Sequence, residues 1–188
     1  MPSKNSILFV SKHPVFNFGF NKEEVIAKLF LSLKALNNSF SMLPSYNFWN
    51  LSDFKDLNPS RYIINFLFEH LDEFGDPKSD ISKCIDYAVK ESPSFGGFVL
   101  VGKMDNTVVS VIIVNQTGMK SYIPENILVY IATHIGFRGK GIGKQMMEEA
   151  IKLAHGDIAL HVEPNNPAKF LYEKLGFTNK YLEMRLVK

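Results

Sequence analysis

The chain is poor in cysteine, nearly balanced in charge and free of long apolar runs. Its 188 residues include one cysteine, so no disulfide can form within the chain. A formal net charge of +2 is too small to indicate nucleic-acid binding. The N-terminus lacks an adequate signal-peptide core, and no apolar run approaches the ~20 residues that span a bilayer. We therefore expect a cytoplasmic protein that binds neither membranes nor nucleic acids.

The single cysteine and the five histidines show no pattern that is typical of a reactive or metal site. Cys84 lies in a helical pattern of apolar residues without a histidine nearby in the sequence. This context favours a buried structural thiol over a nucleophile. The histidines lack the spacing of zinc ligands, so the sequence predicts no metal centre.

An apolar content of 46% is enough for a core, and we expect one α/β (α+β) domain, residues 1–188, built from two regions. Residues 1–93 are mostly helical and aromatic-rich, with a short strand, Ile7–Val10, and helices at Asn21–Leu36, Arg61–Phe74 and Asp80–Lys90. Residues 94–188 are predicted to form a hairpin (Phe98–Lys103 and Thr107–Asn115), a strand (Ile127–Thr133), a helix from about Gly141 to His155-Gly156, a strand (Asp157–Val162), a helix ending near Leu175, and a final strand.

A basic, glycine-rich turn joins the strand Ile127–Thr133 to the amphipathic helix that follows it. The strand is short, apolar and β-branched, which predicts burial on both faces. A helix N-terminus offers unpaired N–H groups and a partial positive charge, and glycines let a phosphate come close to them. Arg138, Lys140 and Lys144 add positive charge to the same turn. The sequence therefore predicts a site for a phosphate-bearing ligand.

Spacing separates three phosphate-binding motifs. The sequence does not match a Walker A loop, because Gly143-Lys144 is followed by glutamine and Arg138 occupies the place of the first glycine. The dinucleotide fingerprint fails because the run is Gly139-x-Gly141-x-Gly143. Arg138-x-x-Gly141-x-Gly143 resembles the acyl-CoA-binding signature of the GNAT superfamily of N-acetyltransferases. The block from Asn165 to Phe177, NNPAKFLYEKLGF, resembles the second characteristic block of that superfamily.

The resemblance covers residues 98 to 188 and implies both a fold and a cofactor. The implied fold is a mixed, mostly antiparallel sheet that is flanked by helices and splayed between two central strands, which end at Thr133 and Val162. Residues 1–93 would then be a helical region on the acceptor side, and 94–188 the acetyl-CoA-binding core. The residues implied in binding acetyl-CoA are Ile131, Ala132, Thr133, Arg138, Gly139, Lys140, Gly141, Ile142, Gly143, Lys144, Asn165, Ala168 and Tyr172.

The resemblance also implies direct transfer of an acetyl group from acetyl-CoA to a primary amine. Tyr172 matches the family's proton donor to the departing sulfur, and its unperturbed pKa of about 10 keeps it protonated at neutral pH. The backbone N–H of Thr133 is the expected oxyanion donor. Strand parity places His161 and Glu163 on one face, and either could accept the amine's proton, with His134 as a third candidate. An ordinary role as exposed polar residues is equally compatible with each candidate base.

Several alternatives stay open at the level of the sequence. A catalytically silent CoA-binding or regulatory module would keep the same two blocks, and a longer acyl group could replace acetyl. The acceptor is a small-molecule or peptide amine that the sequence does not identify. The tail after Phe177 is short, so one closing strand of the sheet is expected to be missing or supplied by a neighbour. An open edge strand would make a homodimer plausible.

Overall fold

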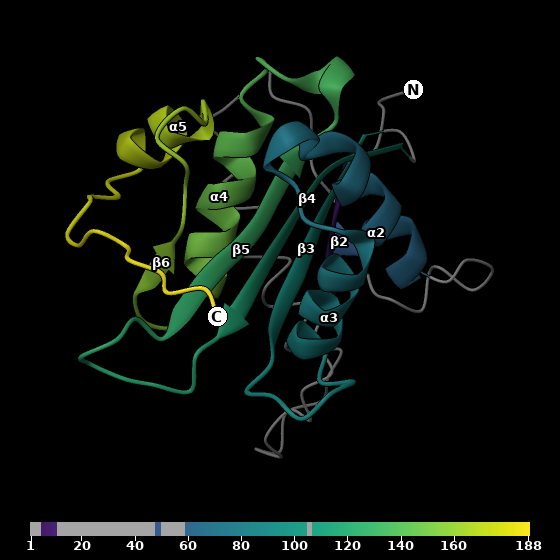
Figure 1. Cartoon of the computed structure of the whole chain (residues 1–188). Helices are drawn as coiled ribbons and strands as arrows, with labels where there is room; N and C mark the ends of the chain where they lie inside the picture. Colours follow the sequence, from purple (N-terminus) through teal and green to yellow (C-terminus); the bar gives the residue numbers. More distant parts are fainter. Residues whose placement is uncertain (1–4, 11–47, 50–58, 105–106) are drawn as a thin grey trace, which may run out of the picture.

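The computed structural model describes residues 5–10, 48–49, 59–104 and 107–188, which form one sheet with helices on both faces (Figure 1). The strands are β1 (Asn5–Val10), β2 (Phe48–Trp49), β3 (Gly97–Met104), β4 (Thr107–Gln116), β5 (Asn126–Thr133) and β6 (Ile158–Leu160). The described strands stand in the order β2-β1-β3-β4-β5-β6. β1, β3, β4 and β5 pair antiparallel in that order, whereas β2 and β6 are parallel to their neighbours. The predicted mixed, mostly antiparallel sheet is confirmed.

The helices divide between the two faces of the sheet. The helices are α2 (Pro59–His70), the 3₁₀ turn η3 (Asp72–Phe74), α3 (Lys78–Ala88), the 3₁₀ turn η4 (Ile135–Phe137), α4 (Ile142–Leu153) and α5 (Ala168–Lys174). Side chains alternate along β3, so Val99 and Val101 pack with α2 and α3, while Phe98 and Leu100 pack with α4. Figure 1 shows α2 and α3 on one side of the sheet and α4 and α5 on the other.

β5 keeps one partner along its whole length and loses the other. Its antiparallel pairing with β4 continues to the pair Ser110 and Thr133. Its parallel pairing with β6 stops at Leu128 and Leu160. From there to Thr133, none of the described strands pairs with the β6-side edge of β5. The predicted splay is confirmed, but β6 is the outermost of the described strands and not a central one.

The closed end of the splay is held by polar groups around Asn126, which is 1% exposed. Its side-chain amide donates to the carbonyls of His155 at 2.8 Å and Asp157 at 3.2 Å. The Glu125 carboxylate accepts from the backbone N–H groups of Asp157 and Ser121, and these hydrogen bonds hold the pKa of Glu125 below its usual value. The chain that enters β6 is therefore fixed at the start of β5, and the strands separate only beyond this point.

The structure confirms several predicted elements within the described residues. β1 contains the predicted short strand, β3 and β4 form the predicted hairpin, and α3, α4 and α5 match the three predicted helices to within a few residues. Cys84 is buried as expected, and burial raises the pKa of its thiol to about 12. The predicted helix Asn21–Leu36 lies outside the described residues. No helix in the described residues is both long enough and apolar enough to cross a membrane.

Three predictions about the strands and one about a helix need correction. The predicted helix Arg61–Phe74 breaks at Leu71, where a 3₁₀ turn begins. β5 is not buried on both faces, because β6 diverges and leaves Val129 37% exposed. β6 ends at Leu160 and not at Val162. No final strand forms in residues 178–188, since no described strand lies beside them, and Met184 is 94% exposed.

We expect Asn126→Ala to lower the free energy of unfolding by about 1–3 kcal/mol, because the variant removes two side-chain hydrogen bonds at a residue that is 1% exposed. Urea titration followed by circular dichroism measures this change. Asn65→Ala is the matched control, since Asn65 bonds Lys78 at an exposed site; we expect a change below about 0.5 kcal/mol there. Equal destabilisation by the two variants would contradict the conclusion that the Asn126 side chain fixes the point where β5 and β6 separate.

Candidate functional site

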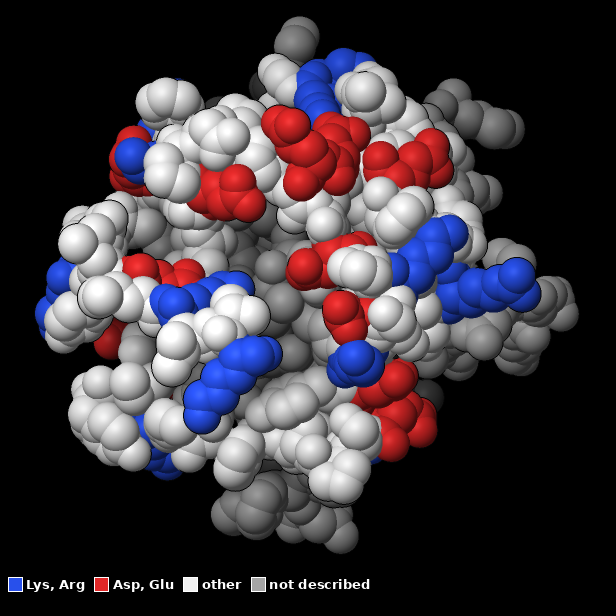
Figure 2. All heavy atoms as spheres, in the orientation of Figure 1, with Lys and Arg blue, Asp and Glu red and all other residues white. Residues whose placement is uncertain are grey.

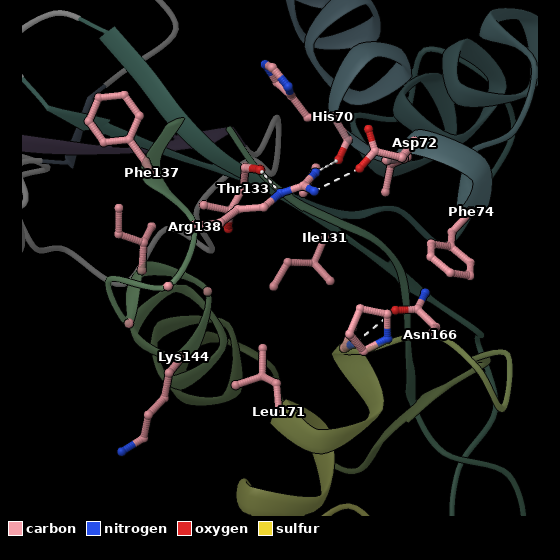
Figure 3. Close-up of a pocket in the computed structure, with 18 residues that line it drawn as sticks. His70, Asp72, Phe74, Ile131, Thr133, Phe137, Arg138, Lys144, Asn166 and Leu171 are labelled. Carbon is pink, nitrogen blue, oxygen red and sulfur yellow. Dashed lines mark hydrogen bonds and ion pairs between the residues drawn. The ribbon is translucent and has the colours of Figure 1, made fainter. Parts of the chain in front are cut away.

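The splay opens into a cavity of about 550 Å³ that four parts of the chain surround, the fourth being the start of α5 (Figure 3). The first part is the end of β5, from Ile131 to Thr133, and the second is the turn that leads into α4. The third is the segment that follows α2, opposite the start of α5 (Figure 3). The lining residues are His70, Leu71, Asp72, Phe74, Ile131, Ala132, Thr133, Phe137, Arg138, Gly139, Gly141, Ile142, Gly143, Lys144, Asn166, Pro167, Ala168 and Leu171.

The glycine turn presents backbone N–H groups to this cavity. Gly139 and Gly141 have φ of +74° and +78°, a left-handed conformation that side-chain-bearing residues rarely adopt. The first hydrogen bond of α4 runs from the N–H of Gln145 to the carbonyl of Gly141, at 3.1 Å. The N–H groups of residues 142–144 therefore have no partner within the helix. A Cβ on either left-handed glycine would meet no atom within 4 Å, so the turn has room for a phosphate group.

The basic side chains of the turn do not converge on that space. The Arg138 guanidinium donates to Asp72 Oδ2, the His70 carbonyl and the Thr133 carbonyl, at 2.8, 2.6 and 3.1 Å. Lys140 donates to the Gly136 carbonyl, and Lys144 lies 3.5 Å from Glu148. Figure 3 shows Arg138 and Lys144 pointing in different directions. Arg138 and Lys144 line the cavity but bond other partners, so their part in binding an anion stays a prediction. The backbone N–H groups at the start of α4 are the other groups of the turn that suit an anion.

The end of β5 contributes backbone and small side chains. Ile131, Ala132 and Thr133 line the cavity, as expected for the strand that continues without β6. The Ser110 hydroxyl, which is fully buried, donates to the carbonyl of Ala132 at 2.8 Å. This contact from β4 fixes the strand end from behind. The cavity therefore has a rigid strand edge on one side and the α4 N-terminus at one end.

Tyr172 is buried beside the cavity and does not line it. The residue is 7% exposed within the apolar cluster of α4 and the sheet, and its ring meets Phe177 edge-on at 5.9 Å. Burial raises the pKa of Tyr172 to about 12, so the hydroxyl keeps its proton at neutral pH. The structure thus gives this residue the protonation state of an acid, while its neighbour Leu171 takes the place on the cavity wall.

The three candidate bases lie in different surroundings. His161 and Glu163 are exposed, follow the end of β6 and do not line the cavity. His161 Nε2 lies 3.7 Å from the Glu183 carboxylate. His134 Nδ1 accepts the N–H of Gly136 at 3.1 Å, so this hydrogen bond already engages one ring nitrogen. This hydrogen bond makes His134 the weakest of the three candidates.

The remaining predicted binding residues separate into two groups. Ala168 lines the cavity, whereas Lys140 and Asn165 do not. Asn166, the next residue, lines it instead, and its Oδ1 accepts the N–H of Ala168 at the start of α5. The sequence reasoning also missed the wall after α2, from His70 to Phe74, because it assigned these residues to the end of a continuous helix. The turn that the sequence indicates at Gly75-Asp76-Pro77 was the one signal that the chain changes direction there.

The space-filling view shows a hollow in this face of the molecule (Figure 2). Acidic side chains gather above and to the right of the hollow, over the side of α2 and α3. The sequence from 69 to 80 accounts for this charge, since it holds Glu69, Asp72, Glu73, Asp76 and Asp80 against a single lysine, Lys78. The side of the cavity formed by the segment after α2 is therefore acidic, whereas the other side carries Arg138 and Lys144.

Comparison with known proteins places this site in a family. The family described as "Acetyltransferase (GNAT) domain" matches residues 96–179. The mouse cysteine-rich protein 2-binding protein is 31% identical over 112 residues. That match covers 58% of this chain but spans only 13% of the length of the mouse protein.

Two solved structures share the fold at low sequence identity. The aminoglycoside N-acetyltransferase AAC(6')-Iy, in complex with CoA, superposes with a TM-score of 0.53 and 14% identity, over 69% of this chain and 88% of that one. The NatC complex bound to Gag peptide and CoA has a TM-score of 0.50 and 22% identity, over 63% of this chain and 76% of that one. The cavity between β5, the glycine turn and α5 lies within the matched residues except for its wall after α2. Residues 96–179 of this chain are therefore similar to the acetyltransferase (GNAT) domain, and the described sheet shares the fold of these two structures.

Proposed function

We propose that this chain transfers an acetyl group from acetyl-CoA directly to a primary amine. The observation that carries this proposal is the glycine turn, whose unpaired N–H groups stand at one end of a cavity beside the open edge of β5. A pyrophosphate fits the turn, and an extended pantetheine arm with amide groups fits the unpaired strand edge from Ile131 to Thr133. Both solved relatives described above were determined with CoA.

The proposed chemistry uses residues at the open end of the splay. Acetyl-CoA supplies the thioester, and the amine nitrogen forms a C–N bond as the C–S bond breaks. The backbone N–H of Thr133 would stabilise the oxyanion at the end of β5. The Tyr172 hydroxyl would give its proton to the departing thiolate, and burial keeps that hydroxyl protonated. The amine's own proton would pass to His161 or Glu163, directly or through water.

The acidic surroundings of the hollow support an amine acceptor. Most amines are protonated in neutral solution, and a field of negative charge raises their local concentration. The acceptor is therefore expected to be a small molecule or a peptide with a cationic amine. The assay is release of free thiol from acetyl-CoA in the presence of a panel of such amines. Absence of thiol release with every class of amine would reject the enzymatic proposal.

A second candidate function is a CoA-binding module without catalysis. The observation that favours it is the position of Tyr172, which is packed in the apolar cluster and does not line the cavity. Such a module would bind CoA at the same turn but release no thiol. Calorimetric titration with CoA, run beside the thiol assay, separates the two functions. A longer acyl group in place of acetyl is tested in the same assay with longer acyl-CoA donors.

We expect Tyr172→Phe to lower kcat by about 10²-fold or more, because the leaving thiolate loses its proton donor. The affinity for CoA should stay within about threefold, since the phenyl ring preserves the packing of this buried residue. Thiol release and calorimetry measure the two quantities. Tyr181→Phe is the control, because Tyr181 is 77% exposed in the C-terminal segment. An unchanged kcat in the Tyr172 variant would remove this residue from the mechanism.

We expect Gly141→Ala to weaken CoA binding by about tenfold or more. The Cβ would enter the open space beside the turn and strain a backbone whose φ is +78°. Gly176→Ala is a matched control, since Gly176 also has a left-handed φ, +92°, and an equally open environment, but lies outside the cavity. Calorimetry should show near-normal affinity in this control at a similar loss of stability. If both variants lose affinity equally, the turn is not the phosphate site.

The base is identified from the pH dependence of kcat/KM in His161→Ala and Glu163→Ala. A base must be deprotonated to accept the amine's proton, so activity falls as the pH drops through the base's pKa. The variant that lacks the true base should have low activity, and its kcat/KM should no longer fall as the pH drops. If a variant keeps near-normal activity and its kcat/KM still falls at low pH, the replaced residue is not the base. His134→Gln provides a comparison, because glutamine can still accept the N–H of Gly136.

A further inference from the structure

Arg138 belongs to the family signature, yet its side chain hydrogen-bonds to the segment after α2, on another side of the cavity. Its three side-chain hydrogen bonds lead away from the glycine turn, toward the carbonyls of His70 and Thr133 and toward Asp72 (Figure 3). His70 is the last residue of α2, so the guanidinium also places a positive charge at the C-terminal end of that helix. A guanidinium used in this way joins two regions that are 66 residues apart in the sequence.

The segment that Arg138 holds is the acceptor-side wall, defined here as residues 70–77. Leu71 and Phe74 of this wall line the cavity. Asp72 has a φ of +53°, a left-handed conformation that is uncommon for a residue with a side chain. The wall's own hydrogen bonds are long, with the N–H of Phe74 at 3.2 Å and that of Gly75 at 3.3 Å from their acceptors. A short turn with a left-handed residue needs support from outside to keep one conformation.

Two sets of contacts give that support. At the far end of the wall, the Tyr130 hydroxyl donates to Asp76 Oδ2 at 2.6 Å, which ties the wall to β5. At the near end, the rings of His70 and His134 lie 4.4 Å apart, and the Arg138 hydrogen bonds stand beside them. The Arg138–Asp72 ion pair is exposed and contributes little by charge alone. Its strength lies in the planar guanidinium, which binds three fixed acceptors at once.

We propose that Arg138 and Asp72 are positioning residues that hold the acceptor-side wall against the glycine turn, and that the Arg138 guanidinium is not a ligand of the phosphates. The proposal rests on the proposed function in one respect, that CoA binds at this turn. In this proposal the phosphates bind to backbone N–H groups, and Arg138 holds the acceptor-side wall in position.

Hydrogen exchange of the full chain tests the wall without any ligand. In Arg138→Gln, the amides of Phe74 and Gly75 should exchange about tenfold or more faster than in the wild type, because their local opening is no longer opposed by the guanidinium. Asp72→Asn should speed the same amides to a smaller extent, since an amide oxygen can still accept from Arg138. Glu73→Gln is the matched control, because Glu73 is an exposed acid of the same wall, and Arg138 bonds Thr133, Asp72 and His70 instead. Unchanged exchange in Arg138→Gln would overturn the proposal.

Calorimetry with CoA tests the second half of the proposal. The affinity of Arg138→Gln should stay within about threefold of the wild type, because backbone N–H groups bind the phosphates. Arg138→Lys should match it in affinity and still show fast exchange in the wall, since an ammonium does not reproduce the guanidinium fork. A loss of more than about tenfold in Arg138→Gln that Arg138→Lys restores would identify a phosphate ligand and overturn the proposal. If CoA fails to bind the wild type, the proposed function fails, whereas the exchange rates still decide the role of Arg138.

Discussion

The site depends on the loss of one hydrogen-bonding partner by β5. Backbone N–H and C=O groups need partners, and a strand that stays paired on one edge only offers the other edge to whatever can satisfy it. Here β4 holds β5 along its whole length, while β6 leaves it after Leu128. The hydrogen bonds of Asn126 fix where the separation begins. The α4 N-terminus stands at the open end, so one cavity contains a free strand edge and a place for negative charge.

This arrangement separates the requirements for binding from those for proton transfer. Binding of an anion at the turn uses backbone geometry, which is why the left-handed φ of Gly139 and Gly141 matters more than the charge of nearby lysines. Proton donation uses a group that must stay protonated in neutral solution, and an apolar environment supplies that condition for Tyr172. The same burial keeps the ring off the cavity wall. The role of the Tyr172 hydroxyl in the proposed mechanism therefore depends on how the ligand fills the space between β5 and β6.

Sequence patterns predict the elements that form through interactions between residues close together in the chain. The hairpin of β3 and β4, the helix after Gly141 and the left-handed glycines follow from short-range preferences, and the structure contains them. A strand also needs a partner, and the apolar pattern after Tyr181 finds none among the described strands. The direction of the Arg138 side chain could not be predicted either. Its partners, His70 and Asp72, are distant in the sequence, and nothing in a signature of six residues indicates them.

The choice of acceptor must lie outside the signature that identifies the family. In the proposed function, the turn and the strand edge would contact groups that every acyl-CoA has in common, so they could not distinguish one amine from another. The wall after α2 differs in kind, because it comes from outside residues 96–179 and brings Leu71, Phe74 and an acidic surface to the cavity. Discrimination then requires that this wall keep one position relative to the thioester, since small displacements of a reacting group are costly. An arginine whose side chain bonds to the wall meets that requirement, whereas the same side chain directed at phosphate would not.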